Sequence, residues 1–410
     1  MSATNNLKTI WIINQYASTP ETGMGGRHYY LARGLEKLGH KVYIVAASYT
    51  HLLRQPPDVN GFYTLERREG VNILWVKMPE YDHAHSKKRI LNWFIFGLKI
   101  LGVRKSLPDS PDVILYSSPS LVGYLGAERL ARRLHATLVF EVRDIWPLTL
   151  CELGGYAPSH PFIRFLQWIE DRAYRNADLV VSNLKSAWQH MVEHGLKRAK
   201  FHWIPNGIWL DEVTSPEPLR EAVQGKLPQD AFVVGYTGTL GLANSMDTLV
   251  EAAALLKDYP NIKFVLVGEG RERPAIEALI QKLGVESVIF TGAIPKAQVQ
   301  IVLQQCNALF LAVKMSSLYR FGVALNKLYD YLYAGKPLLY AIDSGDYHPV
   351  TEANCGIEVA PENPKALADA ILKLYHLPAD ERNRMGQSGR QLALAQYEYG
   401  SLAEKLVSIF

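Results

Sequence analysis

Cysteine and long apolar runs are both scarce in this chain of 410 residues. The three cysteines, Cys151, Cys306 and Cys355, are too few and too scattered for a disulfide framework or a cysteine-rich zinc site. No stretch approaches the roughly 20 uncharged residues of a membrane-spanning helix. The apolar run at 10–13 follows a polar N terminus and is far shorter than the core of a signal peptide. We therefore expect a soluble or surface-bound protein of a reducing, cytosolic compartment.

Several catalytic motifs are missing as well. The chain has no G-x-S-x-G elbow and no Walker-type G-K-[ST] sequence. It also matches no DNA- or RNA-binding module. These absences give no support to a serine hydrolase, a P-loop NTPase or a nucleic-acid-binding protein, and we expect no bound metal.

The net charge of +4 conceals an uneven distribution. Residues 1–205 contain 26 basic and 17 acidic side chains, a balance of +9, and the remainder contains 18 and 23, a balance of −5. A basic half suggests contact with an anionic partner such as nucleic acid, phosphate or a lipid surface. The alternative is that so mild an excess has no functional meaning.

The chain alternates short apolar segments with helical ones, which is typical of parallel sheets covered by helices on both faces. In the first half we predict helices at 29–38 and 162–173 and strands at 9–14, 41–46, 73–76, 113–116, 137–141, 179–182 and 201–204. The second half repeats this rhythm, with a predicted helix at 247–256 and strands at 232–237, 263–267, 288–291, 308–313 and 337–341.

The predicted fold class is therefore α/β, with two doubly wound, Rossmann-like domains. We place the domains at 1–210 and 231–395, joined by a proline-containing linker at 211–230, and expect a helix at 396–410 to return to the first domain. In open α/β sheets, ligands bind beyond the carboxyl ends of the strands. We therefore expect the site in a cleft between the two domains.

Two glycine-containing loops follow the first strand of each half. Gly25 and Gly26 precede a predicted helix near residue 27, and 238–241 (GTLG) precedes a helix near residue 245. Glycines let the backbone approach a ligand closely, and a helix N terminus favours an anion. The spacing differs from that of the dinucleotide fingerprint. Ordinary flexible turns are the alternative for both loops.

Two pairs of charged residues are further candidates. Arg143 and Asp144 stand at the end of a predicted strand, and Lys327 and Asp330 lie on one face of a predicted helix that ends at Gly335. A carboxylate near a helix start can accept hydrogen bonds from both hydroxyls of a ribose. Structural ion pairs are the alternative for each pair.

The segment 86–106 has basic residues on both sides of an aromatic and aliphatic stretch of about fourteen residues. This pattern fits a helix that lies in a membrane interface with its cations at the headgroups. The alternative is a helix whose apolar face packs on its own domain. The residues predicted to contact the membrane are Lys87, Lys88, Arg89, Trp93, Phe94 and Phe96.

Several short strings, taken together, resemble the family 4 retaining glycosyltransferases of the GT-B fold over nearly the whole chain. They are the first glycine-rich loop, 177–182 (ADLVVS), 204–207 (IPNG), 235–238 (GYTG), 267–270 (VGEG) and 330–337 (DYLYAGKP). The strings EVRDIWP and NKLYDYLYAGKP are similar to those of the branch that builds O-antigen and other surface polysaccharides, which contains the N-acetylfucosamine transferases.

The resemblance implies a sugar nucleotide bound in the second half and an acceptor bound in the first. Of the family's two glutamates, the first falls on Gly322 and only the second keeps a carboxylate, at Asp330. The family's Arg and Lys clamp on the diphosphate falls on Thr239 and Asn244, so both of those charges are missing.

Other groups are expected to complete the donor site. Arg271, Arg320 or Lys327 would supply the missing charge. The backbone of 321–323 would hold the diphosphate or the sugar, and the loop at 292–295 would pair with the base. The full expected donor set is Gly238, Thr239, Glu269, Arg271, Ile294, Arg320, Gly322, Val323, Lys327 and Asp330.

In the first half, Arg143 and Asp144 would contact the sugar or the acceptor, and Gly25 and Gly26 would let their loop close over the diphosphate. The implied reaction retains the anomeric configuration and needs no metal or further cofactor. The expected function is transfer of an N-acetylated, UDP-linked sugar to a polyprenyl-diphosphate-linked saccharide at the inner, anionic face of the cytoplasmic membrane. The alternatives are a GDP-linked donor, a sugar-nucleotide epimerase or hydrolase, and a scaffold that binds without transfer.

Overall fold

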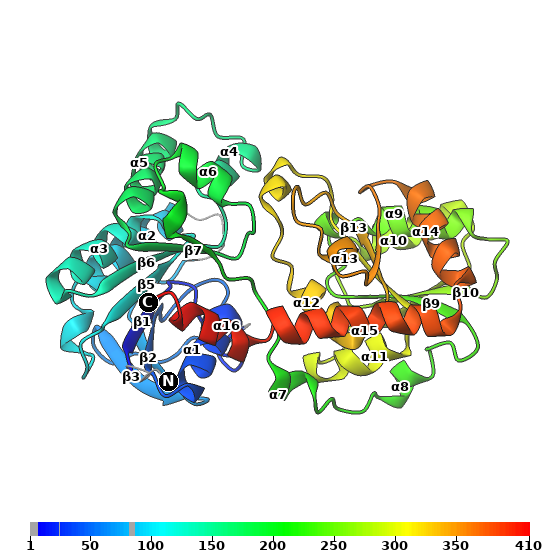
Figure 1. The fold of residues 1–410 in the computed structure, drawn as a ribbon, viewed down its shortest axis with the longest axis horizontal. Coiled ribbons are helices and arrows are strands. Elements are labelled where there is room, and N and C mark those ends of the chain that lie inside the picture. Colours follow the sequence, from blue (N-terminus) through cyan, green and yellow to red (C-terminus); the bar gives the residue numbers. More distant parts are fainter. Residues whose placement is uncertain (1–6, 24, 82–86) are drawn as a thin grey trace. The chain divides into compact units, whose positions relative to one another are not determined.

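The computed structural model describes residues 7–23, 25–81 and 87–410, except the side chain of Lys87. The chain forms two units, of which the first comprises Met1–Pro205 with Tyr399–Phe410 and the second comprises Asn206–Glu398. Each unit contains one sheet with helices packed on it (Figure 1). The predicted fold class of two Rossmann-like α/β domains is confirmed.

The sheet of the first unit has the order β3-β4-β2-β1-β5-β6-β7-β8, and only β3 runs antiparallel to its neighbour. The order reverses between β1 and β5, where ligands of doubly wound folds bind. The strands are β1 (Thr9–Ile13), β2 (Lys41–Ala47), β3 (Tyr63–Arg68), β4 (Val71–Val76), β5 (Val113–Ser117), β6 (Thr137–Val142), β7 (Leu179–Ser182) and β8 (Phe201–Trp203).

All the strands predicted in this half are present, but β3 was not predicted. It is an edge strand of sequence YTLERR, and none of its residues is fully buried. A strand that lies mostly outside the core carries no continuous apolar run, which is the signal used to find the others.

Helices of the first unit cover both faces of its sheet (Figure 1). On one face, α1 packs on α16 so closely that a Cβ added to Gly34 would lie 2.8 Å from the Cβ of Ala403. On the other face, α2 crosses α3, and a Cβ added to Gly126 would lie 2.3 Å from the carbonyl oxygen of Gly97. The helices are α1 (Arg27–Lys37), α2 (Lys87–Ile100), α3 (Val122–Leu134), α4 (Leu148–Glu152), α5 (Pro161–Asn176), α6 (Trp188–Glu193) and α16 (Tyr399–Val407).

The structure of α2 shows that the membrane prediction is wrong for two of its residues. Trp93 and Phe96 are buried, and the indole N–H of Trp93 donates to the hydroxyl of Tyr16 at 2.8 Å. These two aromatic residues therefore belong to the core of the unit, because α2 turns that side toward α3 and α5. Phe94 is 38% exposed, and its ring lies at the rim of the contact with α5. Lys88 and Arg89 follow the start of the helix, where the side chain of Lys87 lies outside the described part of the chain.

The sheet of the second unit is entirely parallel, with the order β11-β10-β9-β12-β13-β14. Its order reverses between β9 and β12. The strands are β9 (Phe232–Thr237), β10 (Ile262–Val267), β11 (Val288–Gly292), β12 (Ala308–Ala312), β13 (Leu338–Ala341) and β14 (Gly356–Glu358). Only β14 was not predicted, since it is a three-residue, half-buried edge strand.

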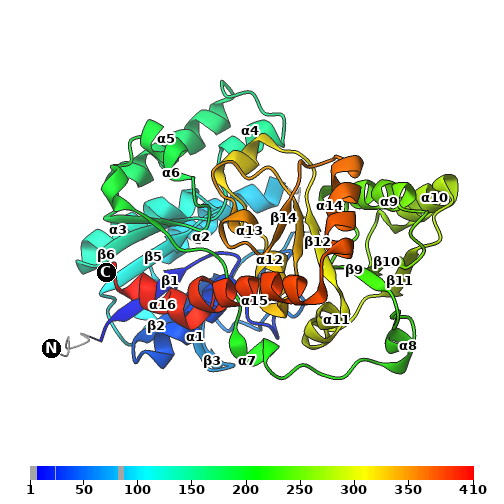
Figure 2. The ribbon, with the colours of Figure 1, turned by 45° about the vertical axis from the view of Figure 1, so that its right-hand side comes forward.

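Helices surround this second sheet as well, and α15 runs along α12 (Figure 2). The segment 211–230, predicted as a linker, is grouped with the second unit and contains two short helices. None of the helices in the described ranges is long and apolar enough to cross a membrane. The helices are α7 (Leu210–Val213), α8 (Glu221–Gln224), α9 (Met246–Leu255), α10 (Arg273–Leu283), α11 (Val299–Gln305), α12 (Asn326–Ala334), α13 (Pro349–Glu352), α14 (Pro364–His376) and α15 (Ala379–Gln396).

Candidate functional site

The glycine loop of the second unit begins where β9 ends. Gly238 has φ +139°, a conformation that favours glycine. A Cβ at this position would lie 3.1 Å from Nζ of Lys327 and 3.2 Å from its Cδ. The backbone conformation therefore favours glycine here, and any side chain would also displace the lysine that approaches from α12.

Lys327 is a half-buried cation in the first turn of α12. Its ammonium group donates to the hydroxyl of Tyr236 at 2.7 Å and to Oδ1 of Asn244 at 2.8 Å. Both partners are neutral, and no carboxylate within the described ranges pairs with it. Burial lowers the pKa of Lys327 to about 8. A positive charge that is half removed from water and not neutralised is well suited to bind an anion.

The N terminus of α9 lies next to Asn244. Ser245 holds a left-handed conformation, φ 46°, and is 1% exposed. Its buried hydroxyl oxygen has no hydrogen-bond partner in the part of the chain that the structure describes. The free N–H groups at the start of a helix attract an anion. Lys327 and this helix terminus therefore form one electropositive site, joined through Asn244.

Asp330 lies one turn of α12 beyond Lys327. One of its carboxylate oxygens, Oδ2, accepts a hydrogen bond from Nζ of Lys296, which directly follows the loop at 292–295. The other oxygen, Oδ1, has no partner among the described residues. The lysine thus holds the carboxylate beside the loop after β11 and leaves one oxygen able to accept from a hydroxyl group.

The remaining donor residues predicted from the sequence are more dispersed. Thr239 is exposed, Ile294 is half-buried and Val323 is buried. The N–H of Gly322 donates to the carbonyl of Tyr319 at 2.8 Å, so this amide is already engaged.

None of the other acidic or basic candidates takes the place of Lys327. Glu269 is paired with Arg273, and Arg271 is exposed. The guanidinium of Arg320 lies over the ring of Phe321 and lines a pocket of about 350 Å³ beyond β12 and β13. Of the three cations proposed to supply the missing charge, Lys327 is placed next to Asn244 by a hydrogen bond of 2.8 Å.

The glycine loop of the first unit is fixed through buried charges at the start of α1. Gly25 and Gly26 have φ +63° and +111° and lead directly into Arg27. Nε of Arg27 donates to Oε1 of Glu141 at 2.8 Å, and Nε2 of His28 lies 2.6 Å from its Oε2. Glu141 belongs to β6, so this network ties the helix start to the carboxyl edge of the sheet.

Burial and neighbouring charges both act on the pKa values of Glu141 and His28 in this network. Burial alone would raise the pKa of Glu141, but Arg27 and His28 together hold that pKa well below its usual range. Burial lowers the pKa of His28, although Glu141 opposes the shift. Sequence reasoning did not assign these residues. The available signal was a glutamate inside the apolar strand TLVFEV, since a buried carboxylate needs a partner.

Arg143 and Asp144 follow β6 at the same edge. The backbone N–H of Arg143 donates to the hydroxyl of Ser118 at 2.9 Å, and its side-chain Nε is buried without a partner among the described residues. The side chain of Asp144 is exposed. Three more buried polar atoms without a described partner follow neighbouring strands, namely Gln15 Oε1, Ser120 Oγ and Asn183 Oδ1. Such unmet groups are rare in protein interiors, and this edge suits a ligand rich in hydroxyl groups.

The Glu141 network gives a direct test of how α1 is held. We expect Glu141→Gln to lower the free energy of unfolding by about 3–5 kcal/mol, because it leaves the buried charge of Arg27 uncompensated. Urea denaturation measures this. The control Glu277→Gln removes an exposed partner of Arg273 and should cost less than ~1 kcal/mol. Equal losses in the two variants would show that the network does not hold the helix.

Comparisons with known proteins agree with this division into two halves. Residues 22–207 match the family model described as "Glycosyl transferase 4-like domain", and residues 220–392 match the model described as "Glycosyl transferases group 1". The chain is 24% identical to the putative colanic acid biosynthesis glycosyl transferase WcaI of Escherichia coli K12, over 66% of this chain and 69% of that protein.

Two further proteins are similar. The chain is 27% identical to the alpha-monoglucosyldiacylglycerol synthase of Acholeplasma laidlawii, over 67% of each protein. The fold is also similar to the crystal structure of HepE from Anabaena in complex with UDP and glucose. This similarity extends over 98% of each chain, with a TM-score of 0.64 and 14% sequence identity. At that identity the likeness concerns the fold alone. Together the two family models match most of both units, and they support a glycosyltransferase of family 4 with the GT-B fold.

Proposed function

We propose that this glycosyltransferase takes an N-acetylated sugar from a UDP-linked donor. It transfers the sugar, with retention of the anomeric configuration, to a polyprenyl-diphosphate-linked saccharide of a surface polysaccharide. The name of WcaI refers to colanic acid biosynthesis, and HepE was crystallised with UDP and glucose. These relatives support a polysaccharide product and a UDP donor.

The observation that carries the proposal is the position of Lys327. The family's cationic clamp falls on two uncharged residues here, Thr239 and Asn244. The ammonium group of Lys327 donates to the side chain of Asn244, and this contact supports the proposal that Lys327 replaces the clamp lysine that the resemblance leads us to expect there. Together with the N terminus of α9, it would hold the diphosphate and stabilise the charge that develops as the sugar leaves. In this proposal the countercharge comes from the chain itself rather than from a metal ion.

Asp330 would bind the nucleoside part of the donor. Its free oxygen would accept from the ribose hydroxyls, while Lys296 keeps the carboxylate beside the loop at 292–295. Backbone groups of this loop, which includes Ile294, would contact the base. Uracil and guanine are both compatible with such contacts, and the choice of uracil rests on the UDP in the HepE structure.

The first unit would bind the acceptor. Arg143, Asp144 and the buried polar groups at its carboxyl edge would contact the hydroxyl groups of the saccharide. Gly25 and Gly26 would allow their loop to approach the diphosphate. The transition state would resemble an oxocarbenium ion, as in glycoside hydrolysis. The leaving phosphate would deprotonate the acceptor, so no separate general base is assigned.

A panel of nucleotide sugars tests the donor. We expect UDP-sugars to raise the melting temperature of the purified protein, because a ligand that binds only the folded state stabilises it. GDP- and dTDP-sugars should have much smaller effects, and EDTA should not reduce the UDP response. A response to GDP-sugars alone would replace the proposed donor with a GDP-linked one. No response to any of the three would argue for a scaffold that does not bind nucleotide sugars.

Lys327→Met tests the proposed countercharge. We expect UDP affinity to fall by roughly 10- to 100-fold, the equivalent of one charge-assisted hydrogen bond. In the unaltered protein the affinity should decline as the pH rises above about 8, because the ammonium loses its proton, and this decline should be absent in the variant. Calorimetry at several pH values measures both effects.

The same variant should not damage the fold. The pKa of Lys327 in the folded state is below its usual value, so the protonated side chain destabilises the fold below about pH 8. Removing the charge should therefore keep or raise the melting temperature at pH 7. Lys336→Met is the matched control, since Lys336 is also a half-buried lysine of the same region and takes no part in the proposed site. Equal UDP affinity in the two variants would refute the assignment of Lys327.

We also propose that the first unit contacts an anionic membrane, where a lipid-linked acceptor would be found. The name of the Acholeplasma synthase refers to a diacylglycerol product. The exposed apolar side chains Leu91, Phe94 and Leu98 lie along one side of α2. The ring of Phe94 stacks on Phe165 of α5 at 6.0 Å, and Phe165 stacks on the exposed Trp168 at 6.2 Å.

Basic side chains border this row of rings. A pocket of about 400 Å³ between α3 and α5 is lined by Trp168 and three arginines, Arg129, Arg132 and Arg172. The buried carboxylate of Glu128 holds two of them, Arg132 at 2.7 Å and Arg172 at 2.8 Å. Aromatic rings next to arginines are typical of surfaces that lie at the headgroup level of a bilayer.

Liposome co-sedimentation tests the membrane contact. We expect the double variant Phe94→Ser/Leu98→Ser to lose binding to vesicles that contain phosphatidylglycerol while its melting temperature stays close to that of the unaltered protein. The control Leu255→Ser changes a similarly exposed leucine of the second unit and should bind normally. Phe96→Ser, in contrast, should unfold the unit because Phe96 is fully buried. Unchanged binding of the double variant would contradict the proposed surface.

A further inference from the structure

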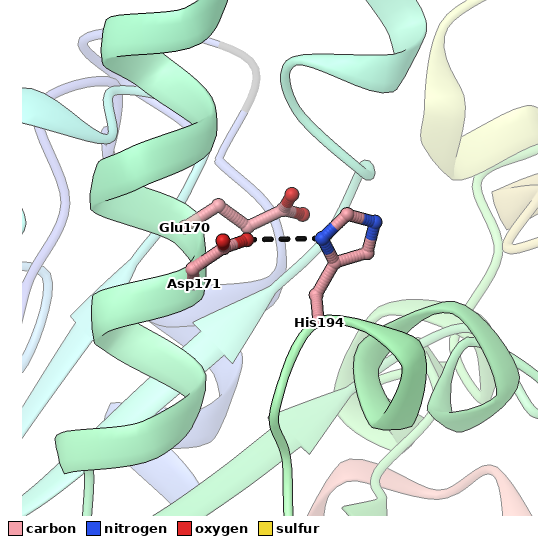
Figure 3. Close-up of side chains that lie close together, drawn as sticks. All are labelled: Glu170, Asp171 and His194. Atoms are coloured by element: carbon pink, nitrogen blue, oxygen red, sulfur yellow. Dashed lines mark hydrogen bonds and ion pairs between the residues drawn. The ribbon is translucent and has the colours of Figure 1, made fainter.

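A cluster of metal-ligating side chains lies in the first unit, where α5 meets the end of α6 (Figure 3). One ligand atom each of Glu170, Asp171 and His194 lies within 4.8 Å of the others. Oδ1 of Asp171 is 2.9 Å from Nδ1 of His194. Glu170 is 1% exposed, and the side chains of Asp171 and His194 are 28% and 29% exposed. The cluster is therefore partly enclosed and accessible from one side.

The two helices present these groups through their regular spacing. Glu170 and Asp171 lie three and four residues after Gln167, on the same face of α5. The sequence HMVEH places His190, on α6, and His194, directly after the end of α6, four residues apart, and their ring centroids are 4.3 Å from each other. This pair of histidines is a signal that the expectation of no metal overlooked.

The hydrogen bonds within the cluster do not account for all of its acceptors. Nε2 of Gln167 lies 2.6 Å from Glu170, 2.8 Å from Asp171 and 2.9 Å from His194. An amide nitrogen carries only two hydrogens, so it cannot donate to three acceptors. If Nδ1 of His194 instead carries a proton and donates it to Asp171, this N–H group faces the N–H group of Gln167 at 2.9 Å. The lone pairs of Glu170, Asp171 and His194 thus converge on one point, and the neutral amide of Gln167 cannot donate a hydrogen bond to all three.

Charge balance is an independent argument. Glu170 and Asp171 are adjacent carboxylates, and the only ion pairs that the described residues offer them are with His190 and His194. No arginine or lysine of the described ranges pairs with either. A carboxylate as deeply buried as Glu170 needs a compensating positive charge. A bound divalent cation would supply that charge and occupy the shared point.

We propose that Glu170, Asp171 and His194 form a binding site for a divalent cation of the zinc class, with Gln167 moving aside or turning its oxygen inward. Zinc binds both imidazole nitrogen and carboxylate oxygen, and three protein ligands leave a fourth position for water. Tyr174, whose hydroxyl donates to Glu170 at 2.7 Å, and His190, 3.2 Å from the same oxygen, would orient the buried ligand.

The role of this site is structural. His194 follows the end of α6, from which the chain returns to the start of β8, whereas Arg143 and Asp144 follow the end of β6. The cation would join α5 to α6 and take no part in sugar transfer. The site is independent of the proposed donor and acceptor.

Zinc titration of the full chain tests the proposal. The protein is prepared without a histidine tag, treated with EDTA, dialysed and titrated with zinc chloride in a calorimeter. We expect about one strongly bound ion per chain and a higher melting temperature in the zinc-loaded protein. Asp171→Asn and His194→Ala should each abolish this binding, and Tyr174→Phe should weaken it by about 10-fold.

The matched control is His348→Ala. His348 and Glu358 form an ion pair of the same kind at 2.8 Å, but with a single carboxylate. Binding that survives in this variant and is lost in Asp171→Asn and His194→Ala supports the site. Weak binding that all variants share would overturn it, as would the absence of binding in the unaltered protein. Melting of the metal-free variants identifies any that fail to fold, and the isosteric Asp171→Asn then decides.

Discussion

A parallel strand can only be followed by a second parallel strand if the chain first returns to the starting end of the sheet. All loops that leave such strands are therefore collected at one edge, and the rest of this molecule depends on that constraint. In each unit the strand order reverses once, between β1 and β5 and between β9 and β12. The glycine loops, the strand-end pair Arg143–Asp144 and the cation Lys327 all belong to these edges.

The buried charges at the carboxyl edges of the two sheets have different kinds of partner. In the first unit, Glu141 is compensated by Arg27 and His28, which makes the network a fixed support for the start of α1. In the second unit, Lys327 has only neutral partners, and its lowered pKa reflects the cost of holding a cation there. The first arrangement is complete without a ligand, whereas in the second the charge of Lys327 has no counterion among the described residues. This difference agrees with a donor diphosphate in the second unit.

Much of the fold follows from the sequence because buried parallel strands are short apolar runs that pattern alone can find. The exceptions, β3 and β14, are edge strands with little burial. The orientation of α2 could not be predicted, since aromatic residues occur on both of its sides and only packing on α3 decides that Phe96 is inside and Phe94 outside.

At the candidate site, the resemblance to family 4 glycosyltransferases implies that charges are missing at 239 and 244, and the sequence offers three replacements. Only the three-dimensional contact between Lys327 and Asn244 selects one of them. The Glu141 network joins residues more than a hundred positions apart, and no local spacing reveals such a contact. The histidine pair at 190 and 194 was visible in the sequence, but its carboxylate partners lie on another helix.

The return of the chain to its first unit has a consequence for biosynthesis. The helix α16 packs against α1 through Gly34 and Ala403, so residues near both ends of the chain share one core. Domains generally fold in the order in which the ribosome releases them. Here the unit that emerges first lacks α16 until Tyr399–Val407 has been synthesised, whereas the second unit, complete at Glu398, can fold before it. The sheet that would bind the acceptor thus reaches its final packing only after the second unit has been synthesised.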